Sequence, residues 1–421
     1  MVEEETSERK RIDYLDGLRG CAALAVLIFH SLLIFSQPLS NLQDVLGRPG
    51  VLVSLIVKVL GLLTNGNSAV CIFFILSGYV MADFAGNTRL GLPAQFVRRY
   101  IRLALPVLIT STCAYLLLRF GLFRNTESAR IFGGWLGLWY QFAPSGEAMA
   151  LESVIGTFVD GANAYNPNLW TMRPEIMGSF YVLAIGTIGR RRAWRTLLYL
   201  CLAAYYVFDY LPLFAVGALL REHEATVRRV ISGVFPPIAV FGLGYYFCSL
   251  PELGSAGLFL HLVYPLPQFA FDNTRYWHSI GATLVLLGVL GSPLLQTAFA
   301  SRPGKFLGRI SFTLYLIHVP VFCSLGAWLI VLLVPHGEAT AAGIGLPVTI
   351  AVSIGLATLL SPVVDGGAIL LSRYVGRRLD DATRRAVHLF QGVFGRNVTS
   401  TSASVVTAVP PATRASSEKQ A

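Results

Sequence analysis

Long apolar runs separated by short polar segments dominate the pattern of this 421-residue chain. Most runs extend over about 15 to 25 residues, which is the length of an α-helix that crosses a lipid bilayer. The pattern predicts an all-α, polytopic transmembrane bundle of about ten spanning helices. Their expected positions are 18–37, 68–84, 100–120, 174–189, 194–208, 210–220, 230–250, 278–299, 310–334 and 343–371.

The remaining segments set the expected boundaries of the membrane domain, which covers residues 13–372. Residues 1–12 form a polar lead, and residues 373–421 form a polar tail that we expect to be disordered. The run at 51–63 is too short to span, so we interpret it as a re-entrant or interfacial helix. Residues 121–173 are interpreted as a long loop with aromatic residues suited to a membrane interface, namely Trp135, Trp139 and Tyr140.

Composition supports a multi-pass membrane protein, in a membrane that the sequence does not identify. Hydrophobic residues make up 54% of the chain and charged residues 13%, about half the charged share of soluble domains. The net charge of +10 does not indicate nucleic-acid binding, because the cations lie beside the apolar runs. Of the 33 Lys and Arg residues, 26 fall on the N-terminal side of the ten-helix arrangement, which predicts two cytoplasmic termini.

The first apolar run contains one imidazole, His30, eleven residues after Arg19. On a helix this spacing is about three turns, so both side chains share one face, roughly 16 Å apart. Asp16 lies three residues before Arg19 and could pair with it. An ionisable group within a span is a functional candidate, because burying it in hydrocarbon is costly. The alternative is that His30 forms a hydrogen bond to a neighbouring helix.

Three further segments place polar groups in predicted spans. Arg99 and Arg102 share a helical face and would suit phosphate oxygens, although ordinary cytoplasmic positioning of arginines is the alternative. Glu175 lies in a first helical turn, where it either complements the helix dipole, orients an imidazole or binds an acceptor from the outer side. Tyr315 and His318 also share a face, as a functional pair or as a packing contact.

Several enzyme classes lack their sequence motifs here. The chain has no GxSxG, Walker, GxGxxG or HExxH motif, which argues against serine-hydrolase, nucleotide-hydrolysing and zinc-protease sites. The six cysteines form no CxxC pair, so we expect neither a metal site nor a disulfide framework.

Taken in order, these segments resemble the acyltransferase-3 family of integral membrane acyltransferases. The matching segments are DYLDGLRG followed by His30, FFILSGY, RRYIR, LWTMRPE and ISFTLYLIH, within residues 13–320. The resemblance implies about ten core spans and transfer of an acyl group from a coenzyme A thioester to a hydroxyl. The family's Arg-x10-His, Arg-x-x-Arg and Trp-x4-Glu patterns fall on Arg19 and His30, Arg99 and Arg102, and Trp170 and Glu175. Arg173 and Pro174 depart from the uncharged residues of many members.

The resemblance also implies site roles and partners. Acyl-CoA is the expected co-substrate, with acetyl as the expected acyl group, no permanently bound cofactor, and a hydroxylated small molecule, lipid or sugar as acceptor. We expect no fused SGNH-type module of the kind that some family members carry, and this expectation favours direct transfer to a small or lipid-like acceptor, as in similar proteins of fungal natural-product pathways. His30 and Glu175 are the expected catalytic residues, with His30 as general base or as acyl carrier. Arg19, Arg99 and Arg102 would bind coenzyme A, and the supporting residues would be Asp16, Ser77, Tyr79, Trp170, Tyr315 and His318.

Two other classes compete with this interpretation. A transporter could use His30, Glu175 and His318 as a proton relay. The arginine cluster and the absence of detectable inverted repeats disfavour a transporter. A membrane scaffold without chemistry is the third possibility.

Overall fold

The computed structural model describes residues 12–34, 65–132, 134–189, 191–207, 209–250 and 274–403, with side chains up to residue 387. Its regular elements are all helices, and no strand occurs within these ranges. The predicted re-entrant segment at 51–63 lies outside the described residues, as do residues 1–11 of the lead and 404–421 of the tail.

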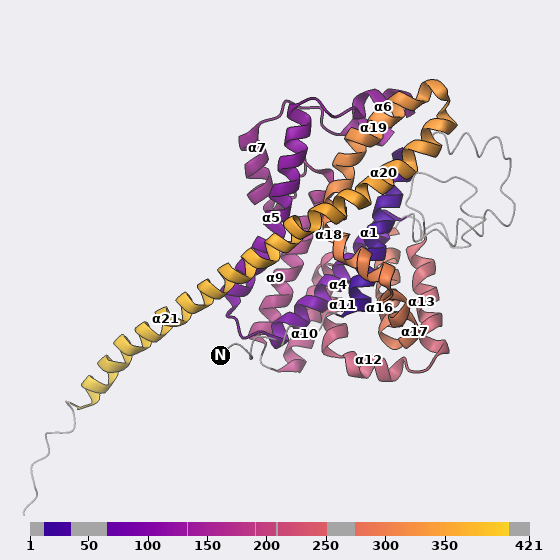
Figure 1. The fold of residues 1–421 in the computed structure, drawn as a ribbon. Helices are drawn as coiled ribbons and strands as arrows, with labels where there is room; N and C mark the ends of the chain where they lie inside the picture. Colours follow the sequence, from indigo (N-terminus) through magenta and orange to yellow (C-terminus); the bar gives the residue numbers. More distant parts are fainter. Residues whose placement is uncertain are drawn as a thin grey trace, which may run out of the picture.

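Helices occupy every predicted span, so the all-α prediction is confirmed (Figure 1). The N-terminal half contains α1 (Asp13–Ile34), α4 (Gly66–Asn87), α5 (Leu92–Arg119), α9 (Met172–Ile188), α10 (Arg192–Tyr205) and α11 (Leu211–Glu222). The C-terminal half contains α12 (Glu224–Val230), α13 (Phe235–Cys248), α16 (Thr274–Gly291), α17 (Pro293–Phe299), α18 (Arg302–Val321), α19 (Ala327–Leu333), α20 (Glu338–Ser361) and α21 (Gly367–Ala403).

Among the described residues, fewer helices have the length and hydropathy of a membrane span than the ten that the sequence predicts. Within the described residues, five helices are long and apolar enough to cross a membrane, or up to seven if each bent helix pair is one span. The helices α9, α10 and α11 have 17, 14 and 12 residues, and a helix needs about 20 residues to cross the hydrocarbon core. The structure therefore does not establish ten spans, and the cytoplasmic placement of both termini stays a prediction.

The predicted loop at 121–173 is largely helical. It contains α6 (Asn125–Phe132), η2 (Gly134–Leu138), α7 (Gly146–Leu151), η3 (Glu152–Gly156), α8 (Thr157–Val159) and η4 (Pro167–Thr171). Burial raises the pKa of the Glu152 carboxyl in this segment, although it accepts a hydrogen bond of 2.9 Å from the Tyr165 backbone N–H. The segment was interpreted as a loop because its short helices lack long apolar runs.

The boundary predicted at residue 372 falls inside helix α21, so residues 373–403 are helical. α20 and α21 follow one another through a π-helical turn at Pro362–Gly366, and α21 projects beyond the bundle (Figure 1). The start of α21 packs along α5. The Asp380 carboxylate accepts a hydrogen bond of 2.7 Å from the Gly91 backbone N–H, just before α5. This contact holds α21 against the segment before α5, although the polar composition of α21 predicts disorder.

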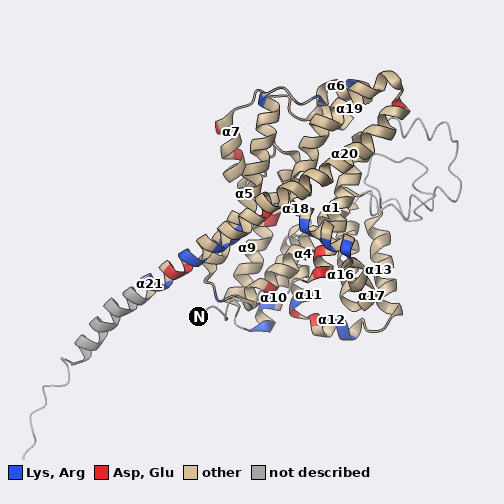
Figure 2. Cartoon of the chain, in the orientation of Figure 1, with Lys and Arg blue, Asp and Glu red and all other residues tan. Residues whose placement is uncertain are grey.

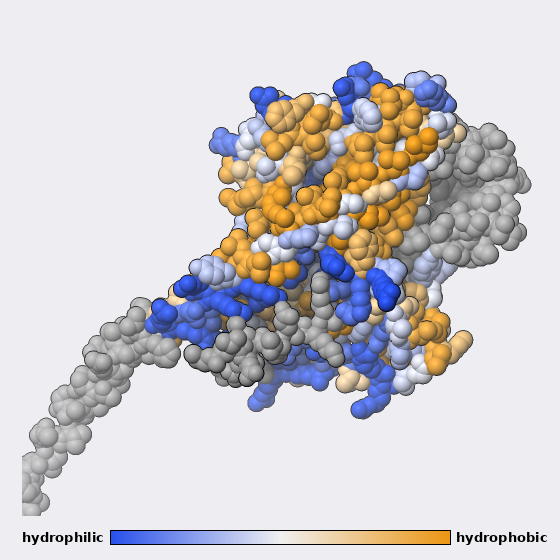
Figure 3. Space-filling view, viewed as in Figure 1, coloured by the Kyte–Doolittle hydropathy of each residue, from blue (hydrophilic) through white to orange (hydrophobic). Residues whose placement is uncertain are grey.

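Charged side chains gather at one end of the bundle. Lys and Arg residues cluster around α10, α12 and the first part of α21 (Figure 2). The face above them, over α5, α18, α19 and α20, is mainly hydrophobic (Figure 3). A hydrophobic belt bounded by polar ends is the surface expected of a helical protein in a bilayer.

Two glycines set the register between α1 and α18, which pack side by side. A Cβ on Gly20 would overlap the backbone of Leu307 and Gly308, and a Cβ on Gly308 would overlap the Asp16 carbonyl. His30 follows Gly20 by ten residues, and His318 follows Gly308 by ten residues. Because the helices are in contact at both levels, they run parallel, and the glycine contact brings the two imidazoles to the same depth, about 15 Å further along.

Replacing Gly308 with alanine is expected to destabilise the protein, because the added methyl group must push α1 and α18 apart. Overpacking of this kind costs about 1–3 kcal/mol. Gly343→Ala and Gly355→Ala in α20 are matched controls, since an added Cβ there meets no atom within 4 Å. Thermal unfolding of the purified variants in detergent checks this. A Gly308→Ala protein as stable as the two controls would contradict the proposed close packing.

Candidate active site

The centre of the site is a hydrogen-bonded pair of imidazoles from α1 and α18. The His318 Nε2 atom lies 3.0 Å from the His30 Nδ1 atom. The Nδ1 atoms of His30 and His318 also lie 3.1 Å and 3.2 Å from the backbone carbonyls of Val26 and Leu314. A carbonyl oxygen only accepts, so we assign a proton to each Nδ1. His30 then donates to His318 Nε2, and the lone pair of His30 Nε2 has no hydrogen-bond partner among the described residues.

His30 lines a cavity of about 1160 Å³. Tyr315 of α18 and Trp170 of η4 line the same cavity. Trp135 packs against His30 with 4.9 Å between the ring centroids. The His30 imidazole therefore contacts the Trp135 ring and also borders the cavity, an arrangement that would let it act on a bound molecule.

The η4 segment fixes the position of α18 behind His30. The Asn166 side chain donates a hydrogen bond of 2.7 Å to the Leu316 carbonyl, and Asn168 donates one of 3.0 Å to the Tyr315 carbonyl. The Tyr315 hydroxyl in turn donates to the Asn168 carbonyl at 3.0 Å and lies 2.9 Å from the Thr171 hydroxyl. These four side chains are buried, so their hydrogen bonds offset the cost of burying polar groups. The Oδ1 atom of Asn166 is the exception, because it has no partner among the described residues.

Arg99 and Glu175 form an ion pair between α5 and α9, with only 10% and 11% of their side chains exposed. The Ser77 hydroxyl of α4 donates a hydrogen bond of 2.6 Å to the same Glu175 oxygen. The Arg99 Nε donates to the Ser179 hydroxyl at 2.9 Å. The sequence placed Glu175 and Arg99 in different predicted spans and did not predict their contact, which the structure shows. The reason is that α9 begins inside the bundle, after the helical segment that precedes it.

The other arginines of the predicted coenzyme A site lie near this ion pair. Arg19 of α1 and Arg102 of α5 are both within electrostatic range of the Arg99 guanidinium. Arg19 makes no hydrogen bond or ion pair with a described residue. The proposed Asp16–Arg19 pair is not among the ion pairs of the described chain. Three guanidinium groups thus gather in one region, and the Glu175 carboxylate pairs with Arg99.

Comparison with known proteins identifies the chain. A sequence model of the acyltransferase domain matches residues 12–361. The chain belongs to the acyltransferase-3 family. No solved structure matches the chain.

Three fungal relatives support the same identification. An acyltransferase of Cochliobolus lunatus is 26% identical, over 74% of this chain and 83% of its own length. An acyltransferase of a Phoma species is 27% identical, with the same two coverages. An O-acetyltransferase of Phomopsis amygdali is 25% identical, over 77% of this chain and 75% of its own length. The protein is therefore an acyltransferase that is embedded in a membrane by several helices.

The geometry also bears on the transporter alternative. A proton relay through His30, His318 and Glu175 would need the carboxylate within reach of an imidazole. Among the described contacts, Glu175 forms an ion pair with Arg99 and accepts a hydrogen bond from Ser77, and it contacts neither imidazole. The membership of the acyltransferase-3 family decides in favour of an enzyme.

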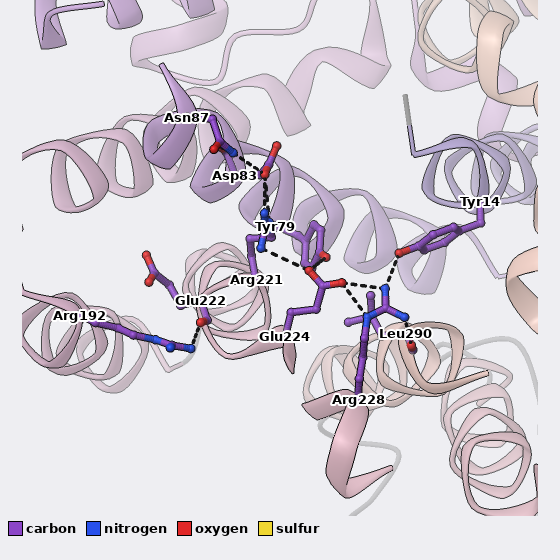
Figure 4. Close-up of polar contacts among 10 residues, drawn as sticks. All are labelled: Tyr14, Tyr79, Asp83, Asn87, Arg192, Arg221, Glu222, Glu224, Arg228 and Leu290. Atoms are coloured by element: carbon purple, nitrogen blue, oxygen red, sulfur yellow. Dashed lines mark hydrogen bonds and ion pairs between the residues drawn. The ribbon is translucent and has the colours of Figure 1, made fainter. Parts of the chain in front are cut away.

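Tyr79 lies in a different polar cluster of the acyltransferase, which is centred on Glu224 (Figure 4). The Tyr79 hydroxyl donates a hydrogen bond of 2.6 Å to Glu224. Arg228 pairs with Glu224 at 2.7 Å and donates to the Tyr14 hydroxyl at 3.0 Å. Arg221 bridges Glu224 and Asp83. This cluster connects α1, α4, α11 and α12, so the structure places Tyr79 among groups that hold helix ends together and not beside His30.

Sequence reasoning missed Trp135 and the asparagines of η4 as parts of the site. The sequence shows Trp135 only as an aromatic residue suited to a membrane interface, and the structure adds its contact with His30. Asn166 and Asn168 lie in the same segment as the predicted Trp170 and Glu175, and the alternation Asn-Pro-Asn before a helix was the available signal. Nothing in the sequence indicates which helix they contact, and the structure shows that it is α18.

Proposed function

We propose that this acyltransferase moves an acyl group, with acetyl as the expected group, from acyl-CoA to a hydroxyl of a small acceptor. The observation that carries the proposal is the His30–His318 pair on the wall of the cavity. The name of the Phomopsis amygdali relative, an O-acetyltransferase, supports the choice of an oxygen acceptor and an acetyl group.

His30 acts as the general base in this proposal. Its Nε2 lone pair takes the proton from the acceptor hydroxyl as the oxygen attacks the thioester carbonyl. The carbon–sulfur bond then breaks, the acyl ester is released, and the proton passes from Nε2 to the sulfur of coenzyme A. His318 accepts the Nδ1–H of His30, which holds the imidazole in the tautomer that a base needs.

The arginines supply the expected coenzyme A site. Coenzyme A carries several phosphates, and guanidinium groups bind phosphate oxygens with two N–H donors. Arg19 is the first candidate, because it lies near Arg99 and has no partner among the described residues. Arg99 contributes charge but is held by Glu175, so its direct contact with a phosphate would require that ion pair to rearrange.

Acetyl-CoA is expected to raise the thermal stability of the purified full-length protein in detergent. A ligand at 100 times its Kd stabilises the native state by about 2.7 kcal/mol. Pantetheine, which lacks the nucleotide phosphates, should stabilise it far less. An absence of stabilisation by acetyl-CoA would overturn the proposed donor.

The Arg19→Gln variant tests the proposed contact between Arg19 and a phosphate of coenzyme A. Loss of a charged hydrogen bond of about 1.5–3 kcal/mol should weaken acetyl-CoA binding roughly tenfold or more. Arg130→Gln makes the same charge change on the exposed surface of α6 and should leave binding unchanged. Equal weakening in the two variants would show that only net charge matters.

A further inference from the structure

Helix α21 packs against the bundle with one face only. Its buried residues on this face recur every four positions, at Ala368, Ser372, Gly376 and Asp380. The face lies along α5. Arg384 pairs with Asp380 at 2.8 Å and also donates a hydrogen bond to the Arg89 carbonyl, in the segment before α5. These contacts fix which side of α21 faces the protein and which side faces away from it.

The side that faces away carries the positive charge of the helix. Residues 373–385 contain five arginines and two aspartates. At about 100° per residue, the arginines fall outside the arc that contacts α5. One of the two aspartates, Asp380, belongs to the contacting arc and is only 8% exposed. All five arginines are exposed, namely Arg373, Arg377, Arg378, Arg384 and Arg385. The outer face therefore has a clear excess of positive charge.

This basic face begins where the hydrophobic surface of the protein ends. α20 and the start of α21 belong to one candidate membrane span. Leu370 and Leu371 are 68% and 43% exposed, as residues in contact with lipid chains would be. Tyr374 follows with 59% exposure, and the Arg378 guanidinium lies 5.4 Å from the centroid of its ring. Tyrosine is enriched where lipid chains meet headgroups, so the arginines that surround Tyr374 lie at the level of the headgroups.

The chemistry of this face matches phospholipids with a net negative charge. Guanidinium groups bind phosphate oxygens with two N–H donors. A zwitterionic headgroup offers the same phosphate but no net attraction at a distance. An anionic leaflet attracts a cluster of arginines next to a span, and each cation contributes separately.

We propose that the outer face of α21 binds anionic phospholipids of the adjacent leaflet. The arginines contact the headgroups, while Leu370 and Leu371 contact the lipid chains. The bound lipids hold α21 at the membrane surface where it leaves the bundle (Figure 2). This inference does not depend on the proposed function, because it uses none of the residues that are expected to bind coenzyme A or to act on the acceptor.

The test measures lipid binding to the full-length protein in detergent by native mass spectrometry. Phosphatidylserine and phosphatidylcholine with the same acyl chains are titrated separately, and phosphatidylserine should bind more tightly. The combined Arg373→Gln, Arg378→Gln and Arg385→Gln variant keeps the Arg384–Asp380 pair. Its affinity for phosphatidylserine should fall about tenfold or more, because three attractive charges are lost. The corresponding triple lysine variant should keep most of the preference, because it keeps the charges.

The matched control removes three charges from exposed residues of other elements, as Arg191→Gln, Arg229→Gln and Arg302→Gln. This control should keep the preference for phosphatidylserine. Equal affinity of the unaltered protein for both lipids would overturn the inference, as would equal losses in the two glutamine variants. Acetyl-CoA should still stabilise the α21 glutamine variant. Loss of that stabilisation together with an intact lipid preference would assign these arginines to coenzyme A and would also overturn the inference.

Discussion

Changing His30 to alanine is expected to lower acyl transfer about 100-fold or more, while acetyl-CoA continues to stabilise the protein. General-base catalysis typically contributes about 10²–10⁴-fold to a rate. His30 lines the cavity, and the three arginines that are expected to bind coenzyme A do not line it. The loss should therefore appear in kcat, with little change in the KM for acetyl-CoA. Steady-state coenzyme A release with an accepted hydroxyl probe checks it.

His318→Gln provides a second, graded variant for the same mechanism. Glutamine can still accept the Nδ1–H of His30 through its carbonyl oxygen, so transfer should fall less than in His318→Phe, which cannot accept. His318 acts through His30, and the pH profile separates this role from a structural one. His318→Phe should shift the pH dependence of kcat, whereas a general loss of folding would lower the rate without a shift. A His30→Ala protein with the wild-type rate would remove His30 from the mechanism.

The sequence predicts that His30 and His318 lie in helices, but it does not predict that the two histidines contact each other. The apolar runs predict α1 and α18, and each histidine stands out as an ionisable group in a span. The sequence also contains the equal spacing from Gly20 to His30 and from Gly308 to His318. However, this spacing becomes meaningful only once the two helices are known to pack in parallel, and periodicity alone does not identify the neighbours of a helix.

The segment between α5 and α9 is where prediction from the sequence fails most. Hydropathy detects long apolar runs only. Short helices that pack against a bundle are therefore predicted as a loop. The loop interpretation therefore did not predict the contact of Trp135 with His30 or the pairing of Glu175 with Arg99. The burial of Asn166 and Asn168 is possible because backbone carbonyls of α18 accept their amide protons, a pairing over about 150 residues of sequence that no local pattern reveals.

The same segment explains why functional residues from distant positions form one site. η4 contacts α18 through its asparagines, and α9 follows directly with Glu175, which pairs with Arg99. Glu175 is also within electrostatic range of Tyr315. The link between the two regions is the chain itself, because Asn168 and Thr171 of η4 contact Tyr315 on the cavity wall and Glu175 follows in α9.

Removing one member of the Arg99–Glu175 pair is expected to be strongly destabilising. Loss of one partner leaves a buried charge uncompensated, which costs about 3–5 kcal/mol, whereas replacing both by apolar residues is often nearly neutral. Arg99→Met and Glu175→Met should therefore each lower the apparent Tm markedly in detergent. The double variant should recover most of the loss. The remainder reflects Ser77 and Ser179, which lose their charged partners.

The exposed pair Arg124–Glu127 is the matched control, because about half of each side chain is exposed. Arg124→Met should change stability by less than about 1 kcal/mol, as is usual for a surface ion pair.

Activity then separates two roles for the buried Arg99–Glu175 pair. We expect the double Arg99→Met, Glu175→Met protein to fold but to transfer acyl groups at least about tenfold more slowly, because the carboxylate of Glu175, an expected catalytic residue, and the guanidinium of Arg99, an expected coenzyme A ligand, are both removed. Recovery of both stability and rate in the double variant would show that the pair only holds α5 and α9 together.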